Sequence, residues 1–96
     1  MSNSSFNSII HAPNRLQICA LLAPAEALEF IVIKNHLEVS DSVLSKHIKV
    51  LEDAGIVKVE KKIRNGRNHT WVSLSTEGKK AFEEHVNKLK EIVGLK

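Results

Sequence analysis

Residues Ser40–Val57, SDSVLSKHIKVLEDAGIV, carry the clearest structural pattern of the chain. Ser40 is a favourable N-cap residue, and Asp41 places a negative charge in the first turn, where it complements the helix dipole. Leu44, Ile48 and Leu51 then recur at helical spacing and form one apolar stripe. Gly55 is suited to the left-handed position that follows a helix C-terminus. The stretch therefore predicts an amphipathic helix over residues 40–54.

After Gly55 the apolar period changes from 3.6 to 2, which indicates a strand. Val57, Val59 and Ile63 fall on one face of this strand. The dipeptide Asn65-Gly66 is the strongest short-range signal for a β-hairpin. A two-residue turn there pairs the following positions: Arg64 with Arg67, Val59 with Val72, and Val57 with Leu74. The turn and the alternation agree on one register, because that register gathers the apolar side chains on one face.

Helices are expected on both sides of this unit. Residues 14–23 predict a helix, with Pro13 in its first turn and Pro24 ending it. This helix is apolar on nearly every side, so the rest of the fold or a second subunit must cover it. A second helix begins at about residue 26 or 30 and ends at residue 37, before a tight turn at residues 38–39. Ser75 caps a last helix over residues 76–93.

Length and composition exclude several classes of protein. The chain has 96 residues, enough for one domain spanning residues 1–96, whose polar residues 1–8 are expected to be disordered. No apolar run approaches the ~20 residues of a membrane span, and the start lacks the features of a secretory signal. Cys19 is the single cysteine, which makes a reducing cytoplasm the expected location.

The sequence offers little for catalysis or metal binding. The four glycines are isolated, so no phosphate-binding loop is present, and Cys19 lies in the most apolar predicted helix. The five histidines show no pair at metal-ligand spacing. His47 lies next to the apolar stripe, where a packed, hydrogen-bonded side chain is the expected role. We therefore expect no enzyme, no metal site and no cofactor.

The formal charge of +3 is small, but it is unevenly distributed. Residues 45–69 carry seven basic against three acidic side chains, a net +4, whereas residues 1–44 carry a net −2. On charge alone, a polyanionic partner and a solvated surface remain equally open. The joint placement of this charge on a helix and a hairpin tip favours DNA, because such a helix can enter the major groove and arginines can enter the minor groove. The candidate DNA contacts are Ser42, Val43, Ser45, Lys46, Lys49, Arg64, Arg67 and Asn68. Asp41 argues against this assignment, since a carboxylate near DNA repels phosphate unless it accepts from cytosine N4.

The chain resembles the small winged-helix regulators of the MarR/ArsR type, and most of all the compact MarR-like group of about one hundred residues. Three segments carry the resemblance: IIHAPNRL at residues 9–16, Ser40–Val57, and LSTEG at residues 74–78. The resemblance implies an α+β, mainly helical winged helix-turn-helix fold with three helices, a β-hairpin wing and a C-terminal helix. The paired-cysteine box of metal-sensing relatives is absent, so a metal-sensor role is not implied.

The resemblance also implies a homodimeric regulator of transcription that binds double-stranded DNA sequence-specifically. Terminal helices commonly form the dimer interface in this family, in agreement with the apolar faces found here. The expected interface residues are Ile10, Leu16, Leu21, Phe82, Val86, Leu89 and Val93. An unidentified small-molecule effector is a further expected partner. The alternative is a winged-helix protein-interaction module that does not bind DNA. Trp71 could pack on a helix, line a small-molecule pocket or touch a partner subunit, and packing is its expected role.

Overall fold

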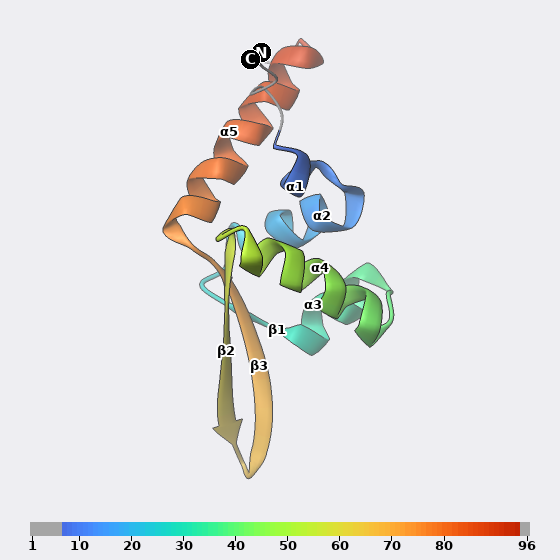
Figure 1. Ribbon diagram of the computed structural model, residues 1–96, viewed down its shortest axis with the longest axis vertical. Helices are drawn as coiled ribbons and strands as arrows, with labels where there is room; N and C mark the ends of the chain where they lie inside the picture. The colour runs from blue at the N-terminus through green and yellow to red at the C-terminus, as the bar shows by residue number, and fades with distance from the viewer. Residues whose placement is uncertain (1–6, 95–96) are drawn as a thin grey trace.

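The structure is a computed structural model that describes residues 7–94 of the chain. Its elements in chain order are α1 (Ser8–His11), α2 (Pro13–Leu22), β1 (Leu28–Glu29), α3 (Phe30–Leu37), α4 (Asp41–Asp53), β2 (Val57–Arg64), β3 (Arg67–Leu74) and α5 (Thr76–Ile92). The helices α1 to α4 form a compact body, from which the β2–β3 hairpin projects in one direction and α5 extends in the other (Figure 1). The α4 helix lies across the middle of the molecule beside the base of the hairpin, and the hairpin tip lies at one end (Figure 1).

The helix-turn-helix unit consists of α3, the turn at residues 38–40, and α4. The α3 helix begins at Phe30, the later of the two predicted starts. Glu38 adopts a left-handed conformation (φ 57°), which ends α3 and turns the chain within two residues. Ser40 then caps α4 as predicted, because its side-chain oxygen accepts a hydrogen bond from the backbone N–H of Val43. The predicted apolar stripe of α4 is confirmed, since Leu44, Ile48 and Leu51 are all buried.

The hairpin has the register that the sequence predicts. Arg64 faces Arg67, Val59 faces Val72 and Val57 faces Leu74. The turn residues Asn65 and Gly66 both have positive φ, 53° and 74°, as a two-residue turn matched to the twist of the strands requires.

The short strand β1 was not predicted. It pairs with β3 through Leu28–Val72 and Glu29–Trp71, which makes a three-stranded antiparallel sheet in the order β1-β3-β2. A hydrogen bond adds to this edge, because Nδ1 of His69 lies 2.6 Å from a carboxylate oxygen of Glu29. Two residues carry too little periodic pattern to reveal a strand, so β1 becomes visible only when β3 is present to pair with it.

The N-terminal region corrects one expectation. Asn7 and Ser8 were expected to be disordered, but Asn7 caps α1 through hydrogen bonds from the N–H groups of Ile9 and Ile10, and Ser8 lies in that helix. Residues 1–6 of the same expectation lie outside the described residues. The predicted first helix is preceded by α1 because Pro13 disfavours the helical conformation at Ala12, which is extended (ψ 135°) and separates α1 from α2.

The core forms where α1, α2, α3, α4 and the base of the hairpin meet. Its fully buried side chains include Ile18, Leu22 and Ile33, together with Cys19, as predicted for a small core residue. Ile63 shares a hairpin face with Val57 and Val59 but is 77% exposed. The reason is tertiary: the hairpin extends past the helical body, so no helix covers its outer half (Figure 1).

The α5 helix leaves the sheet through a tightly packed corner. Ser75 caps it as predicted, since its oxygen accepts from the N–H of Gly78 at 2.8 Å while its hydroxyl donates to the carbonyl of Gly55 at 2.6 Å. A Cβ on Gly78 would come within 1.9 Å of the carbonyl oxygen of Ile56. The glycine is therefore what allows the first turn of α5 to pack directly on the backbone that joins α4 to β2.

Within residues 7–94, no helix is both long and apolar enough to cross a membrane.

Candidate nucleic-acid interface

The outer face of α4 is polar and accessible. Ser42, Ser45, Lys46 and Lys49 are exposed on it, and Val43 is 40% exposed. Their opposite face is anchored by the buried stripe, so the orientation of α4 follows from the core. The first turn is further fixed by the Ser40 cap, whose side chain also lies 3.2 Å from the hydroxyl of Ser42.

Two lysines on or beside α4 are engaged in ion pairs. Lys49 donates to Asp53 at 3.1 Å, and this hydrogen bond, with the charge of Asp53, raises the pKa of the Lys49 ammonium. Lys34 lies 2.8 Å from the carboxylate of Asp41. The Lys34 contact offsets the charge of Asp41, which sequence reasoning had counted against DNA. No local pattern indicates this pair, because its members lie seven positions apart on two helices with a turn between them.

A histidine clamp fixes α4 on α2. Nη1 of Arg15 donates to Nδ1 of His47 at 3.2 Å, and the side-chain amide nitrogen of Asn14 lies 3.4 Å from Nε2. Burial lowers the pKa of His47, and the charges of Arg15 and Lys46 lower it further. His47 is therefore a neutral, hydrogen-bonded packing residue, as predicted.

We call residues 57–74 the wing. The DNA contacts predicted on the hairpin lie at the tip of this wing. Arg64, Arg67 and Asn68 are all exposed. Because side chains alternate along a strand, Arg64 and Arg67 share one face with Lys58 and Lys62, whereas Asn68 lies on the other face with Lys61. Lys61 was missed by the sequence reasoning, although it is the wing cation that faces α4.

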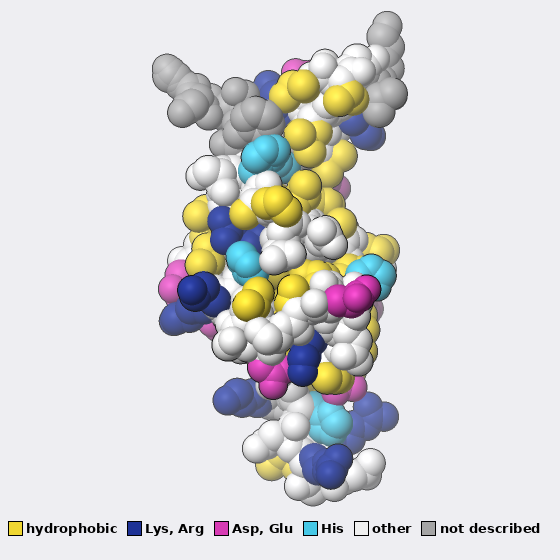
Figure 2. Space-filling view, turned by 90° about the vertical axis from the view of Figure 1, so that its right-hand side faces the viewer, with side chains coloured by type: hydrophobic (Ala, Val, Ile, Leu, Met, Phe, Trp, Pro, Cys, Tyr) yellow, Lys and Arg dark blue, Asp and Glu magenta, His cyan; other side chains and the backbone are white. Residues whose placement is uncertain are grey.

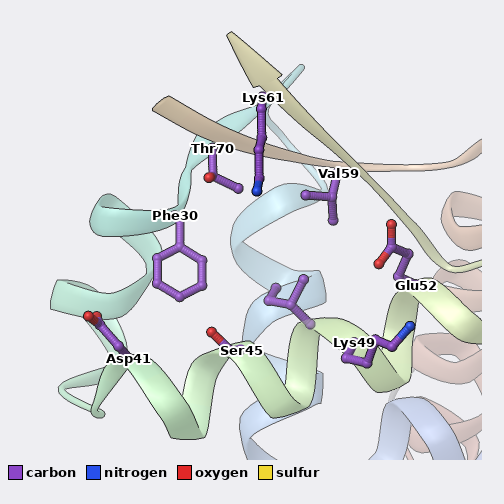
Figure 3. A pocket seen from close by; sticks show the side chains of 9 residues that line it. Phe30, Asp41, Ser45, Lys49, Glu52, Val59, Lys61 and Thr70 are labelled. Carbon is purple, nitrogen blue, oxygen red and sulfur yellow. The ribbon is translucent and has the colours of Figure 1, made fainter. Parts of the chain in front are cut away.

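A cleft of about 390 Å³ separates α4 from the wing, with the start of α3 at one end (Figure 3). Phe30, Ile48 and Val59 give it an apolar lining. Ser45 and Lys49 of α4 and Lys61 and Thr70 of the wing line it as well, with two carboxylates, Asp41 and Glu52. The cleft thus lies between the two groups of candidate DNA contacts, and its lining carries charges of both signs.

The remaining predicted site residues lie on the terminal helices. Leu16, Leu21, Phe82, Val86 and Leu89 are half-buried. Val93 is 66% exposed and Ile92, which sequence reasoning missed, is 60% exposed. A hollow of about 370 Å³ beside α5 is lined by Phe82 and Val86 and by Ala23 from the end of α2. Ile10 differs from the rest, because it is completely buried in the core and has no surface to offer a partner.

The two ends of the molecule differ in surface chemistry. On the face shown in Figure 2, hydrophobic side chains gather over the upper part, whereas lysine and arginine side chains surround the wing below. Trp71 is half-buried on the wing face that carries Arg64, where it lines a hollow of about 370 Å³ together with Glu26 and Ala27. Among residues 7–94, no group of three or more potential metal ligands comes together.

Comparison with known proteins gives a consistent result. A family model described as a winged helix DNA-binding domain matches residues 14–93. An uncharacterized protein of Methanocaldococcus jannaschii is 32% identical over 87 residues, covering 91% of this chain and 90% of that protein.

Solved structures extend the comparison. The transcriptional regulator homologue of Pyrococcus horikoshii OT3 has 31% identity and a TM-score of 0.87, over 92% of this chain and 87% of that one. NadR in complex with 4-hydroxyphenylacetate has 26% identity and a TM-score of 0.75, over 92% of this chain and 62% of that one. HlyU of Vibrio cholerae has 27% identity and a TM-score of 0.65, over 88% of this chain and 84% of that one. These similarities confirm the predicted fold.

Proposed function

Because this chain belongs to the winged helix DNA-binding domain family and is not an enzyme, we propose that it is a homodimeric transcriptional regulator that binds double-stranded DNA sequence-specifically in the cytoplasm. The observation that carries the proposal is the joint placement of α4 and the wing tip. Both present exposed cations or hydroxyls, and α4 and the wing line one cleft through Ser45, Lys49 and Lys61. Such an arrangement suits a helix in the major groove and a hairpin beside it.

The contacts divide into two chemical groups. Ser42, Ser45 and Lys46 lie within the first two turns of α4, where hydroxyls and an ammonium can reach base edges. Lys49, Arg64 and Arg67 are placed to neutralise phosphates or, for the arginines, to enter a narrow minor groove. Asn68 and Val43 complete the proposed set. Lys61 joins it because it faces α4 across the cleft.

The proposed dimer uses the terminal helices. A two-fold axis near α5 would cover the exposed Ile92 and Val93 with the half-buried Phe82, Val86 and Leu89. The same axis would relate two α4 helices, so that each could contact one half of a pseudo-palindromic DNA site. Ile10 supports this surface from the core and does not contact the partner.

A small-molecule effector is the second part of the proposal. NadR, a structural relative, is described in complex with 4-hydroxyphenylacetate. In this chain the cleft of about 390 Å³ between α4 and the wing is large enough for a compound of that size and lies between the proposed DNA contacts. A compound bound there would compete with DNA or change the spacing of α4 and the wing.

The test is a salt-titrated binding assay with random-sequence duplex DNA, followed by selection of bound duplexes from a random library. We expect binding at low salt with a linear dependence of log K on log salt, and selected sites with two related half-sites about one helical turn apart. If no duplex binds even at low salt, the protein-interaction alternative replaces the proposal. Single, unrepeated sites would contradict the dimer alone.

A further inference from the structure

Val43 is an apolar side chain at an unusual place. It lies in the first turn of α4 and is 40% exposed, on a face whose other early members, Ser42, Ser45 and Lys46, are polar. A β-branched residue has a lower helix propensity than an unbranched one, so Val43 does not favour the helix by itself. Its exposed methyl groups are available for an apolar contact on a helix face that is otherwise polar.

The helix segment that carries Val43 is anchored at both ends, at Ser40 and at His47. Its backbone N–H donates to the side-chain oxygen of Ser40 at 3.2 Å, so the cap sets the conformation of its turn. One turn along the helix, His47 is held by Arg15 at 3.2 Å. An exposed apolar side chain on such an anchored helix turn is suited to a specific van der Waals contact with an apolar group of a partner.

Val43 also lines a hollow. Ser42, Val43, Lys46 and His47 surround an open depression of about 350 Å³ on the outer face of α4. Burial and the neighbouring charges of Arg15 and Lys46 lower the pKa of His47, which keeps its ring neutral at pH 7. The lining of the hollow thus combines the apolar Val43 and the uncharged ring of His47 with the hydroxyl of Ser42 and the ammonium of Lys46.

We propose that this hollow receives the C5-methyl group of a pyrimidine in the major groove, and that Val43 is the specificity-determining residue that contacts it. The C5-methyl group is the one apolar feature among the base edges of the major groove. Ser42 and Lys46, on the same hollow, can reach the polar edges of neighbouring bases. This inference rests on the proposed DNA binding and adds the base feature that α4 recognises.

The experiment uses the full chain and a duplex selected from the random library. Each thymine of the selected site is replaced in turn by deoxyuridine, which removes only the methyl group. We expect one thymine in each half-site at which the replacement weakens binding about fourfold, the effect of exposing one buried methyl group. At the other thymines the affinity should stay within the error of the measurement.

Two variants assign the effect to Val43. Val43→Ala should bind the thymine and deoxyuridine duplexes equally. The matched control Val32→Ala removes the same atoms from α3, where Val32 is 49% exposed, and should keep the fourfold difference. The inference is overturned if the wild type shows no sensitive thymine, or if Val43→Ala keeps the sensitivity. In both cases the proposed DNA binding stands, because the selected duplex still binds.

The same duplex identifies the source of the methyl group. At the sensitive position, a C·G pair is compared with one carrying 5-methylcytosine. Tighter binding of the methylated pair supports recognition of the methyl group on either pyrimidine. Equal binding of the two, together with the deoxyuridine effect, supports recognition of thymine alone. Failure of the chain to select any duplex would overturn the proposed function and, with it, the inference.

Discussion

Nη1 of Arg15 and Nδ1 of His47 lie 3.2 Å apart, and this contact joins α2 to α4. Arginine can only donate, so the His47 ring accepts and must be unprotonated at Nδ1. Protonation of His47 at Nδ1 would therefore break this hydrogen bond and weaken the attachment of α4 to α2.

Removing the charge of Arg15 should raise the pKa of His47. Burial and the charges of Arg15 and Lys46 lower it below 6.5. Arg15→Gln keeps a donor but removes one charge, so the pKa of His47 should rise toward its ordinary value. An NMR titration of the His47 ring measures both midpoints, and equal midpoints would contradict the assigned role of Arg15.

The same shift predicts how stability depends on pH. The unfolded chain protonates His47 near pH 6.5, whereas the folded chain protonates it at a lower pH. Acidification thus favours the unfolded state between these two pKa values, and stability is lost as the pH falls through that window. Burial, with the neighbouring His11, lowers the pKa of His85 and acts in the same direction. Urea midpoints should fall from pH 7.5 to pH 5, and less so in Arg15→Gln; a flat profile would contradict this account.

Gly78→Ala should destabilise the chain. A Cβ at this position would meet the Ile56 carbonyl oxygen at 1.9 Å, so α5 would have to move away from the backbone beneath it. Overpacking of this kind costs about 1–3 kcal/mol. Replacing glycine by alanine in a helix gains roughly 1 kcal/mol in helix propensity. The cost is the larger of the two because the opposing group is backbone, which cannot move aside as a flexible side chain can. We expect a net loss, measured by urea unfolding. Lys79→Ala, an exposed neighbour, is the control and should change the free energy of unfolding by less than about 0.5 kcal/mol.

Charge reversal at the wing tip should weaken DNA binding regardless of sequence. In the double variant Arg64→Glu and Arg67→Glu, the salt dependence should become flatter by about one unit for each lost phosphate contact. The control is Lys88→Ala on α5, which lies at the other end of the molecule (Figure 1). An unchanged salt slope in the double variant would rule out phosphate contacts by the wing.

Val93→Glu should dissociate the proposed dimer. Val93 is 66% exposed in the single chain, so the substitution leaves the fold intact and places a charge on the apolar face of α5. Sedimentation velocity at micromolar concentration should show a dimer for the wild type and a monomer for the variant. Ile63→Glu, at a 77% exposed position on the wing, is the matched control and should remain dimeric. A monomeric wild type would refute the interface.

Cys19 should be chemically inert in the folded chain. Burial raises the pKa of its thiol to about 11, which leaves about one thiolate in a thousand at pH 8. Reaction with a thiol reagent should therefore be slow in buffer and fast in denaturant. Rapid labelling under native conditions would show that the core around α2 opens readily.

Two elements, α4 and the β2–β3 hairpin, are specified by residues that are neighbours in the chain. Ser40, Gly55 and the apolar stripe bounded α4, and the Asn65-Gly66 turn with its alternating strands set the register of the hairpin. These features are readable because each depends on residues close together in the chain.

Other features depend on contacts between distant parts of the chain and appear only in the folded protein. β1 exists because β3 is beside it, and the carboxylate of Asp41 is offset by Lys34 from another helix. Ile10 and Ile63 are both isoleucines of the apolar pattern, yet one is completely buried and the other 77% exposed. The physical reason is that burial and ion pairing depend on what lies opposite a side chain, and its partners come from distant parts of the sequence.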